Sequence, residues 1–391
     1  MANDGGWTGS EHRADCRVRV AAAAGWDVSV RCGSPPLLEA GIRNVVEKVA
    51  RAAGVTAAKF EVEDFGALDY VLAARVEGAL RAASMAVGAM APAVERVPTP
   101  RGQRRWSRLY APGNNPRLLA GIELHGADCV LLDLEDAVPS GQKLAARLLV
   151  KHLLAAVAFP AEVWVRVNPL DDGGRDDLAE VIPARPHGIC LPKAEGAEDV
   201  RVVAEALSSA EADVGIPDGT IWLMPIVETA RGVLHSEEIA AADRRVVTLA
   251  FGAEDYLRDT GATRSRETLL WPRAQLVAAA RAAGVQVSDT VYADVEDDEG
   301  LAEEARTARA LGFDGKGAIH PRQVAILHEA FAPSEEDLEN ARRIVVAADD
   351  AEARGLGAVA VDGRMVDRPV LERARRTLRM ARRQDVGETE C

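Results

Sequence analysis

Charged residues end several short apolar runs in this sequence. Residues 129–132 are Cys-Val-Leu-Leu, the composition of a buried strand, yet Asp133, Glu135 and Asp136 follow within four positions. Burying an unpaired charge costs on the order of several kcal/mol, so these carboxylates belong to a polar pocket rather than to a core. Five further apolar runs end in the same way, at Arg166 and Asn168, Lys193 and Glu195, Glu228, Glu254 and Asp255, and Lys316 to His320.

Glu228 and Asp255 are the candidate metal ligands among these residues. Carboxylates outnumber basic groups at the run ends, which favours a hard cation. Mg²⁺ is commonly held by one or two carboxylates, with waters and substrate oxygens completing its shell. No histidine or cysteine accompanies the pair, so zinc is disfavoured. Arg166 can grip a carboxylate through its planar fork, and metal and arginine together predict a site for a 2-oxo or 2-hydroxy acid.

A repeating strand–helix pattern positions these residues. Eight strand-like runs alternate with helical stretches over about 215 residues, which predicts a (β/α)8 barrel of the TIM type, α/β in class. No glycine-rich dinucleotide loop follows the first run, so an open doubly wound sheet is disfavoured. The carboxyl ends of barrel strands form one face, where the charged run ends should meet. The eight runs are WSRLYAPG, CVLLDLED, EVWVRVNP, GICLPKAE, IWLMPIVET, VVTLAFGAED, VQVSDTVYAD and KGAIHP.

A smaller unit precedes the barrel. Residues 16–22 and 26–32 alternate apolar and polar side chains and are predicted to pair as two strands joined through Gly25. A helix that starts near Pro36, a further strand and a second helix complete a small α+β domain. The predicted divisions are this domain at 1–84, a proline-rich linker at 85–103, the barrel at 104–330 and a C-terminal helix-hairpin-helix lid at 331–391.

Composition excludes several classes of protein. The net charge of −14 argues against nucleic acid as the main partner. No apolar run approaches the roughly 18 residues of a membrane span, and the polar N-terminus lacks the core of a signal peptide. A cytoplasmic protein is therefore expected. The five cysteines are scattered without a C-x-x-C pair, so neither a disulfide framework nor a zinc site is predicted.

Several motifs resemble one family in order and spacing, from about residue 104 to 383. They are LYAPGNNP, VLLDLEDAVP, VRVNP, LPKAE, PIVET, FGAEDY, DTVYAD, GFDGKGAIHPRQ and GRMVDRP. Together they resemble the citrate lyase β-subunit family, which includes malyl-CoA and citramalyl-CoA lyases. The resemblance implies a Mg²⁺-dependent (β/α)8 barrel, usually trimeric, that cleaves a 3-hydroxyacyl thioester by a retro-Claisen reaction.

The resemblance also implies roles for individual residues. Glu228 and Asp255 match the metal ligands, and Arg166 matches the residue that holds the oxo-acid carboxylate. Glu135 and Asp136 match groups around metal-bound water. Asp367 matches an acid that a lid from a neighbouring subunit delivers to protonate the departing enolate. By motif position the candidates for contact with the CoA nucleotide are Arg105, Lys143, Arg147 and Arg322.

The N-terminal unit has a resemblance of its own. Its FGALDYVLAARVEGAL segment is similar to the acyl carrier protein, or γ subunit, of citrate lyase. That family carries a phosphoribosyl-dephospho-CoA arm on a serine four residues after a glycine. Gly6 and Ser10 keep this spacing, although the residues around the serine differ. The resemblance therefore implies Ser10 as the attachment point and a separate transferase subunit that loads the carrier.

Three functions remain open from the sequence. The first is cleavage of a citryl thioester to oxaloacetate and an acetyl thioester. The second is the same chemistry on citramalyl-CoA, malyl-CoA or another acyl-CoA. The third is a non-catalytic carrier and assembly subunit, which would predict degenerate metal ligands, whereas Glu228, Asp255 and Arg166 are intact. A Schiff-base aldolase that uses Lys193 or Lys316 is disfavoured, because the acidic pair has no place in that mechanism.

Overall fold

The computed structural model describes residues 6–32, 36–85, 94, 96–354 and 359–385. The chain divides into two compact units, Met1–Val324 and Ala325–Cys391, and each is described by itself. Within the linker predicted at 85–103, residues 86–93 and 95 lie outside the described residues, as do the last six residues of the chain. Within the described part, no helix combines the length and the apolar character that a membrane span requires.

The first unit begins with a four-stranded sheet in the order β1-β2-β4-β3. The structure corrects the predicted hairpin, because β2 and β3 do not pair with each other but lie on either side of β4, β2 antiparallel and β3 parallel to it. The parallel pair requires a crossover, which α1 supplies between β3 and β4. The elements are β1 (Thr8–Gly9), β2 (Cys16–Ala21), β3 (Asp27–Cys32), α1 (Pro36–Ala52), β4 (Lys59–Asp64) and α2 (Asp69–Ala82).

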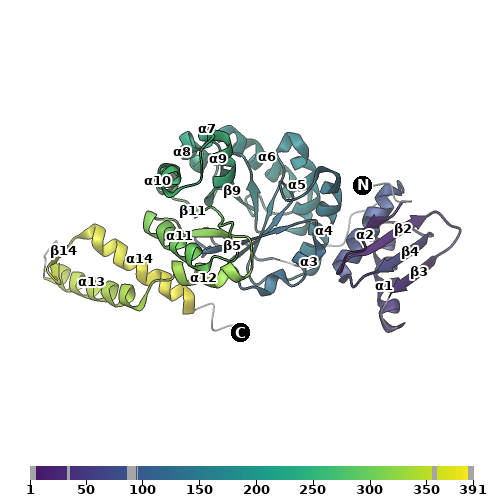
Figure 1. Ribbon diagram of the computed structural model, residues 1–391, viewed down its shortest axis with the longest axis horizontal. Helices are drawn as coiled ribbons and strands as arrows, with labels where there is room; N and C mark the ends of the chain where they lie inside the picture. The colour runs from purple at the N-terminus through teal and green to yellow at the C-terminus, as the bar shows by residue number, and fades with distance from the viewer. Residues whose placement is uncertain (1–5, 33–35, 86–93, 95, 355–358, 386–391) are drawn as a thin grey trace. The chain divides into compact units, whose positions relative to one another are not determined.

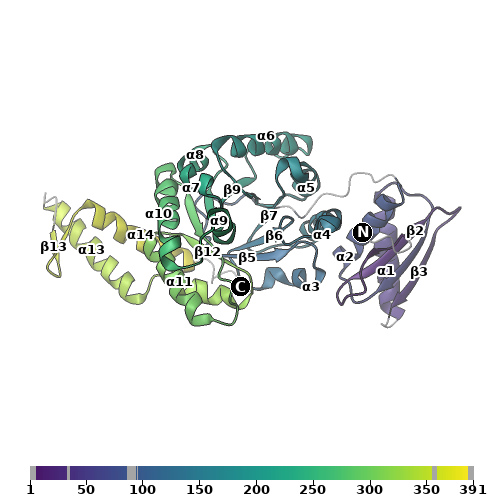
Figure 2. The same ribbon diagram turned by 45° about the horizontal axis from the view of Figure 1, so that its top comes forward.

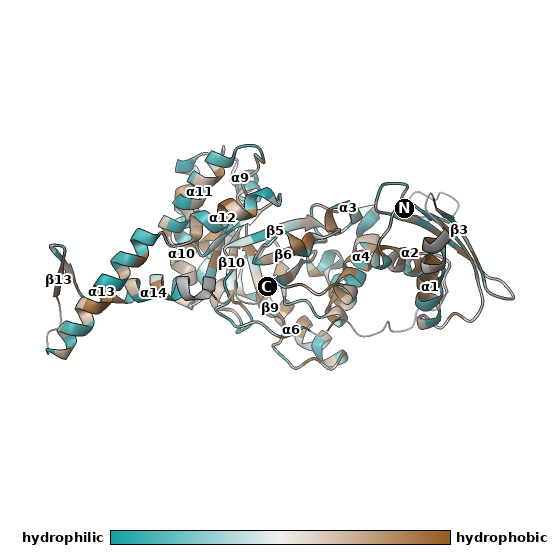
Figure 3. Ribbon diagram, turned by 90° about the horizontal axis from the view of Figure 1, so that it is seen from below, coloured by the Kyte–Doolittle hydropathy of each residue, from teal (hydrophilic) through white to brown (hydrophobic). Residues whose placement is uncertain are grey.

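Helix α2 is buried along its whole middle, from Tyr70 to Leu80. A helix buried on every side needs cover on two faces. The small sheet covers one face, and α4 (Lys143–Ala156) packs on the other. Figure 3 shows hydrophobic stretches along both helices.

A charged cluster lies within this contact between α2 and α4. Glu77, whose side chain is fully buried, accepts hydrogen bonds from Lys151 at 2.8 Å and pairs with His152 at 2.7 Å. Arg81 bridges Glu77 and Glu180. The N-terminal sheet and helices are thus joined to the barrel by paired charges as well as by apolar packing.

Eight parallel strands close into a barrel in the order β5 to β12, which confirms the predicted fold. Helices surround the strands in Figures 1 and 2. The strands are β5 (Ser107–Pro112), β6 (Cys129–Asp133), β7 (Glu162–Arg166), β8 (Gly188–Leu191), β9 (Trp222–Val227), β10 (Thr248–Phe251), β11 (Gln286–Asp289) and β12 (Gly315–Ala318).

The outer helices are mostly short, and several 3-10 or π turns accompany them. The helices besides α4 are α3 (Pro116–Leu119), α5 (Arg175–Val181), α6 (Ala197–Asp213), α7 (Ala230–Leu234), α8 (Ser236–Ala241), α9 (Ala253–Thr260), α10 (Arg266–Ala283), α11 (Asp298–Leu311) and α12 (Arg322–Phe331). The turns are η1 (Ile122–Leu124), η2 (Ser140–Gln142), η3 (Leu170–Gly174) and η4 (Ile182–Ala184).

The barrel interior is filled by side chains and is not a channel. Trp164 is 1% exposed and packs with Met224 and Ile226. A methyl group on Gly188 would lie 2.3 Å from the Trp164 ring, so the large indole depends on this glycine. Cys129 and Cys190 are free and buried in the same core.

The second unit contains two long helices with a hairpin between them. These are α13 (Glu335–Ala353), β13 (Val359–Val361), β14 (Arg364–Val366) and α14 (Arg368–Asp385). Asp362 and Gly363 form the two-residue turn with φ of 50° and 75°, the left-handed conformation that an Asp-Gly turn adopts. Asp367 directly follows β14 and accepts a hydrogen bond from the Val370 N–H at the start of α14.

Candidate active site

A cavity of about 370 Å³ opens at the carboxyl ends of the barrel strands. This is the face at which barrel enzymes carry their active sites. Its charged lining comes from strands that are otherwise apolar, as the run ends predicted. The titratable residues that line it are Tyr110, Asp133, Arg166, Glu228, Glu254, Asp255 and Asp289.

Glu228 and Asp255 come together from neighbouring strands. Glu228 directly follows β9, and Asp255 lies in the first turn of α9, which follows β10. Glu228 is 2% exposed and accepts a hydrogen bond of 2.8 Å from the backbone N–H of Lys193. Burial, with Asp255 adding repulsion, raises the pKa of Glu228 to about 7.

This pair suits a divalent cation, which would relieve the repulsion that raises the Glu228 pKa. In the part of the chain that the structure describes, no three His, Cys, Asp or Glu side chains cluster as a metal site. Most of the coordination shell would therefore come from water and substrate oxygens, the usual arrangement for Mg²⁺.

Gly252 lets Glu228 occupy its position. A Cβ atom at residue 252 would lie 2.4 Å from Oε2 and 2.6 Å from Cβ of Glu228. Any larger side chain there would force the side chain of Glu228 to move. Sequence reasoning missed this residue, although the glycine in FGAEDY directly precedes the helix that carries Asp255.

Arg166 lies in the same cavity and is held by two acids. Its Nε and Nη2 donate to the two carboxylate oxygens of Asp133, both at 2.7 Å, and Nη1 lies 3.2 Å from Glu135. Its guanidinium also stacks over the Tyr110 ring at 5.7 Å. The fork of Arg166 is therefore fixed in orientation by the protein itself.

Glu135 and Lys193 extend this ion-pair network. Lys193 binds Glu135 directly and lies 3.5 Å from the exposed Asp136. Burial raises the pKa of Glu135 more than Arg166 and Lys193 lower it. From the sequence, Lys193 was expected at the end of a strand and was weighed as a Schiff-base lysine, and the structure pairs its ammonium group with Glu135.

Lys316 likewise forms ion pairs with carboxylates. Its buried ammonium donates to Asp289 at 2.9 Å and to Glu304 at 2.6 Å, and Asp289 also binds Arg273 through two hydrogen bonds. A charged, paired lysine is a poor nucleophile, so this geometry agrees with the exclusion of a Schiff-base mechanism.

The structure corrects the expectation that Arg105 contacts the CoA nucleotide. Arg105 precedes β5, is 1% exposed and forms an ion pair of 2.6 Å with Glu162 at the start of β7. Both residues lie at the amino ends of their strands, on the face opposite the cavity. The ion pair of Arg105 therefore joins β5 to β7 at the amino-terminal end of the barrel.

Lys143 is also fully engaged within the protein. Its three ammonium protons are used by the carbonyl oxygens of Leu134 and Glu135 and by Asn168 Oδ1, each at 2.7 Å. Lys143 thus holds the loop that carries Glu135, and its contact with the CoA nucleotide stays a prediction.

The remaining predicted residues lie around the cavity or outside it. Arg147 binds Asp177 and the carbonyl oxygen of Gly173, while the more exposed Arg322 pairs with Glu296 and Asp298. Asp367 belongs to the second unit, where it is half-buried. Ser10 lies in a separate cavity of the first unit.

Family models match both parts of the chain. Residues 106–321 match HpcH/HpaI aldolase/citrate lyase, and residues 6–83 match the acyl-carrier model described as malonate decarboxylase delta subunit (MdcD). The barrel match spans more than half of the chain, so this protein belongs to the HpcH/HpaI aldolase/citrate lyase family, as its motifs predicted. An acyl-carrier-like domain is fused ahead of the barrel.

Individual relatives agree with this assignment. The chain is 40% identical to citrate lyase subunit beta of Haemophilus influenzae over 71% of its own length and 97% of that protein. It is 35% identical to human mitochondrial citramalyl-CoA lyase, covering 70% of this chain and 84% of that one. A solved structure of CitE from Mycobacterium tuberculosis with magnesium, acetoacetate and coenzyme A matches with a TM-score of 0.61 and 35% identity, covering 72% of this chain and 99% of that one.

Proposed function

We propose that this protein is a Mg²⁺-dependent lyase that cleaves a citryl thioester to oxaloacetate and an acetyl thioester by a retro-Claisen reaction. The observation that carries the proposal is the pairing of Glu228 and Asp255 beside a fixed Arg166 in one cavity. The similarity to citrate lyase subunit beta supports the citryl group as substrate.

Glu228 and Asp255 would hold the Mg²⁺ ion, and the relative crystallised with magnesium supports that metal. When bound, the ion supplies a Lewis acid that stabilises negative charge on a substrate oxygen. Glu228 is 2% exposed, so its side chain has little contact with bulk solvent.

Arg166 would orient the carboxylate of the oxo-acid part. Because Asp133 fixes two of its nitrogens, the guanidinium needs little rearrangement when substrate binds. Nη1 is the edge left facing Glu135, whose Oε2 has no hydrogen-bond partner among the described residues. Glu135 and Asp136 would therefore hold the neighbouring cationic groups of Arg166 and Lys193 in position beside the reacting oxygen.

Protonation of the departing enolate requires an acid that reaches the thioester side. We assign this role to Asp367, delivered by a neighbouring copy of the chain in a homo-oligomer, by analogy with the family motif. The thioester would arrive as acyl-CoA or on an arm carried by Ser10, whose hydroxyl donates to Asp15 at 2.7 Å. A separate transferase would be needed to charge such an arm.

The test is a product assay with (3S)-citryl-CoA, citramalyl-CoA and malyl-CoA, each with Mg²⁺ and then with EDTA. Oxaloacetate, pyruvate and glyoxylate are measured separately. We expect metal-dependent oxaloacetate release that Glu228→Ala abolishes and that Glu237→Ala, on the outer helix α8, leaves intact. Release of no oxo acid from any substrate by folded, arm-loaded protein would refute the proposal.

Citramalyl-CoA cleavage is the second candidate, because the human relative at 35% identity bears that name. It would use the same residues and release pyruvate. Preferential pyruvate release in the same assay would select it over the citryl reaction.

A further inference from the structure

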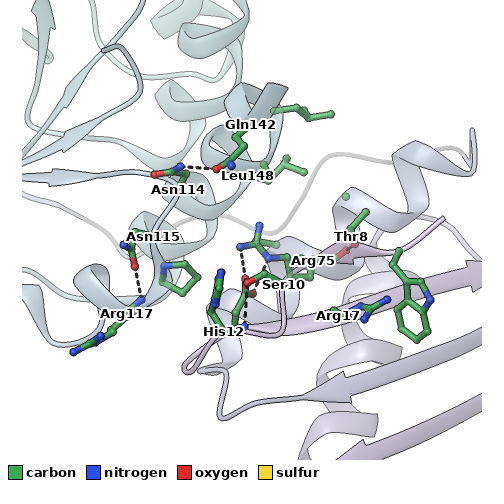
Figure 4. A pocket seen from close by; sticks show the side chains of 18 of the residues that line it. Thr8, Ser10, His12, Arg17, Arg75, Asn114, Asn115, Arg117, Gln142 and Leu148 are labelled. Carbon is green, nitrogen blue, oxygen red and sulfur yellow. Dashed lines mark hydrogen bonds and ion pairs between the residues drawn. The ribbon is translucent and has the colours of Figure 1, made fainter. Parts of the chain in front are cut away.

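A second cavity, of about 940 Å³, lies in the first unit between the carrier-like domain and the barrel loops. Its walls are the β1–β2 segment, α2, the loop after β5 and the loop after β6. Figure 4 shows Ser10, His12 and Arg75 on one side, with Asn114 and Asn115 on the other. We call it the arginine cavity, after the lining residues Arg13, Arg17, Arg75 and Arg117.

The arginine cavity is basic in a protein whose net charge is −14. Among the described residues Asp15 is the only acidic one that lines it, and Arg75 pairs with Asp15 through two hydrogen bonds of 2.9 Å and 3.0 Å. Arg17 pairs with Glu11 and stacks over Trp7. These pairs leave a surplus of positive charge in the cavity.

Arg13 and Arg117 supply this surplus. Both side chains are exposed, and across the described residues neither guanidinium has a hydrogen-bond or ion-pair partner. They can therefore turn onto an anion without breaking an existing pair. Guanidinium groups bind phosphate oxygens through paired hydrogen bonds.

The arginine cavity adjoins the active site through one loop. Asn114, Asn115, Pro116 and Arg117 line the arginine cavity, while Pro112 at the end of β5 and Leu118 in α3 line the Glu228–Asp255 cavity. A ligand held beside Arg117 therefore lies next to the mouth of the barrel. A volume of about 940 Å³ is at the upper end of the range for small-molecule and cofactor sites.

We propose that the arginine cavity binds the phosphate groups of a phosphopantetheine-type chain whose acyl end enters the Glu228–Asp255 cavity. The inference rests on the proposed function, because it takes the substrate to be a thioester. Two sources share this chemistry, a free acyl-CoA and an arm attached to the Ser10 hydroxyl. Both would place phosphates between Arg13 and Arg117.

The experiment uses the full-length, Mg²⁺-loaded protein and CoA as the probe, so it does not depend on turnover. CoA is titrated calorimetrically into the wild type and the double variant Arg13→Ala/Arg117→Ala. The matched control is Arg201→Ala/Arg306→Ala, which removes two exposed arginines from α6 and α11. We expect the dissociation constant to rise at least tenfold in the cavity variant and to change less than twofold in the control.

Hydrogen exchange locates the bound CoA. Protection of peptides covering 8–17 and 113–118, lost in the cavity variant, would support the proposal. Protection confined to the barrel, with an unchanged dissociation constant in the cavity variant, would overturn it. Because binding is measured without cleavage, an inactive enzyme that shows this protection would count against the proposed function alone.

Ser10→Ala separates the two sources. If the chain is an attached arm, wild-type protein from a host that carries the loading enzyme has a mass increased by that of the arm and shows the protection without added CoA. The Ser10→Ala variant from the same host lacks both the added mass and the protection. If the source is free acyl-CoA, Ser10→Ala binds CoA as the wild type does. Either result supports the cavity as the phosphate site, whereas an attached arm that leaves 8–17 and 113–118 unprotected contradicts it.

Discussion

At the scale of single residues, the candidate site depends on the close approach of two carboxylates to each other. Glu228 and Asp255 lie close enough for one to raise the pKa of the other. Arg166 is held by Asp133, and Lys193 is paired with Glu135. Asp255 pairs with Arg258 at 2.6 Å, whereas no ion pair among the described residues joins Glu228, so we expect a cation to bind beside Glu228.

Gly252→Ala should weaken Mg²⁺ binding at least tenfold without unfolding the protein. The new methyl group would lie 2.4 Å from Glu228 Oε2, so the carboxylate must move. Gly196→Ala is the control, because nothing lies within 4 Å of a Cβ at that position. Calorimetric titration of the metal checks both variants. Equal affinities in the two would contradict the role given to Gly252.

Lys143→Met should lower kcat by at least tenfold and leave the dissociation constant of CoA within twofold. The substitution removes the three hydrogen bonds that hold the Glu135 loop and the Asn168 side chain. Steady-state kinetics and CoA titration measure the two effects separately. A large loss of CoA affinity with unchanged kcat would return Lys143 to the nucleotide site.

At the scale of elements, the packing of α2 on α4 depends on a buried glutamate. Glu77 loses hydration on burial, but the hydrogen bonds from His152 and Lys151 outweigh this and lower its pKa from 4.5 to about 2. A carboxyl group with a depressed pKa stabilises the fold above its unfolded pKa. That stabilisation is lost as the pH falls through the folded pKa.

The wild type should therefore lose stability between pH 4.5 and pH 2 by an amount on the order of 3 kcal/mol from Glu77 alone. Glu77→Gln removes this titration, so its unfolding free energy should depend less steeply on pH in that window. Urea unfolding at pH 7, 4.5 and 3.5 gives the comparison, with Glu198→Gln on the exposed surface of α6 as control. Parallel pH profiles for wild type and Glu77→Gln would show that the cluster carries no such linkage.

The helices and strands also show how much of the fold could be predicted from the sequence. All eight barrel strands were predictable, because short apolar runs alternate with helices and most of these runs end in charged residues. The order of the small sheet was not, because β4 arrives after α1 and inserts between two strands that are adjacent in sequence. Arg105 could have been placed correctly, since it precedes its strand and so belongs to the face opposite the site.

Side-chain partners were less predictable than elements. Motif position suggested ligand contacts for Lys143, whereas three acceptors from two loops occupy it in the fold. The close approach of Gly252 to Glu228 depends on the stagger of two neighbouring strands, which periodicity does not encode. The candidate metal pair was visible because both acids end adjacent runs.

At the scale of the whole molecule, the chain joins an acyl-carrier-like domain to a barrel of the HpcH/HpaI aldolase/citrate lyase family. Fusion keeps a carrier and its enzyme at a high effective concentration, on the order of millimolar for a short linker. The arginine cavity, by binding the phosphates of the acyl chain, would hold that chain beside the mouth of the barrel. The carrier-like domain and the barrel would then bind the same substrate, one on each side of the segment that follows β5.

Oxaloacetate release from (3S)-citryl-CoA, as Mg²⁺ is added back to metal-free protein, tests the central claim most directly. Wild-type protein should show release that rises with Mg²⁺ and saturates, while Glu228→Gln should show less than one hundredth of that rate at the same metal concentration. Glu228→Gln keeps the shape of the side chain and removes the charge that would hold the ion. Equal oxaloacetate release by the two proteins, or release that EDTA does not affect, would contradict the account.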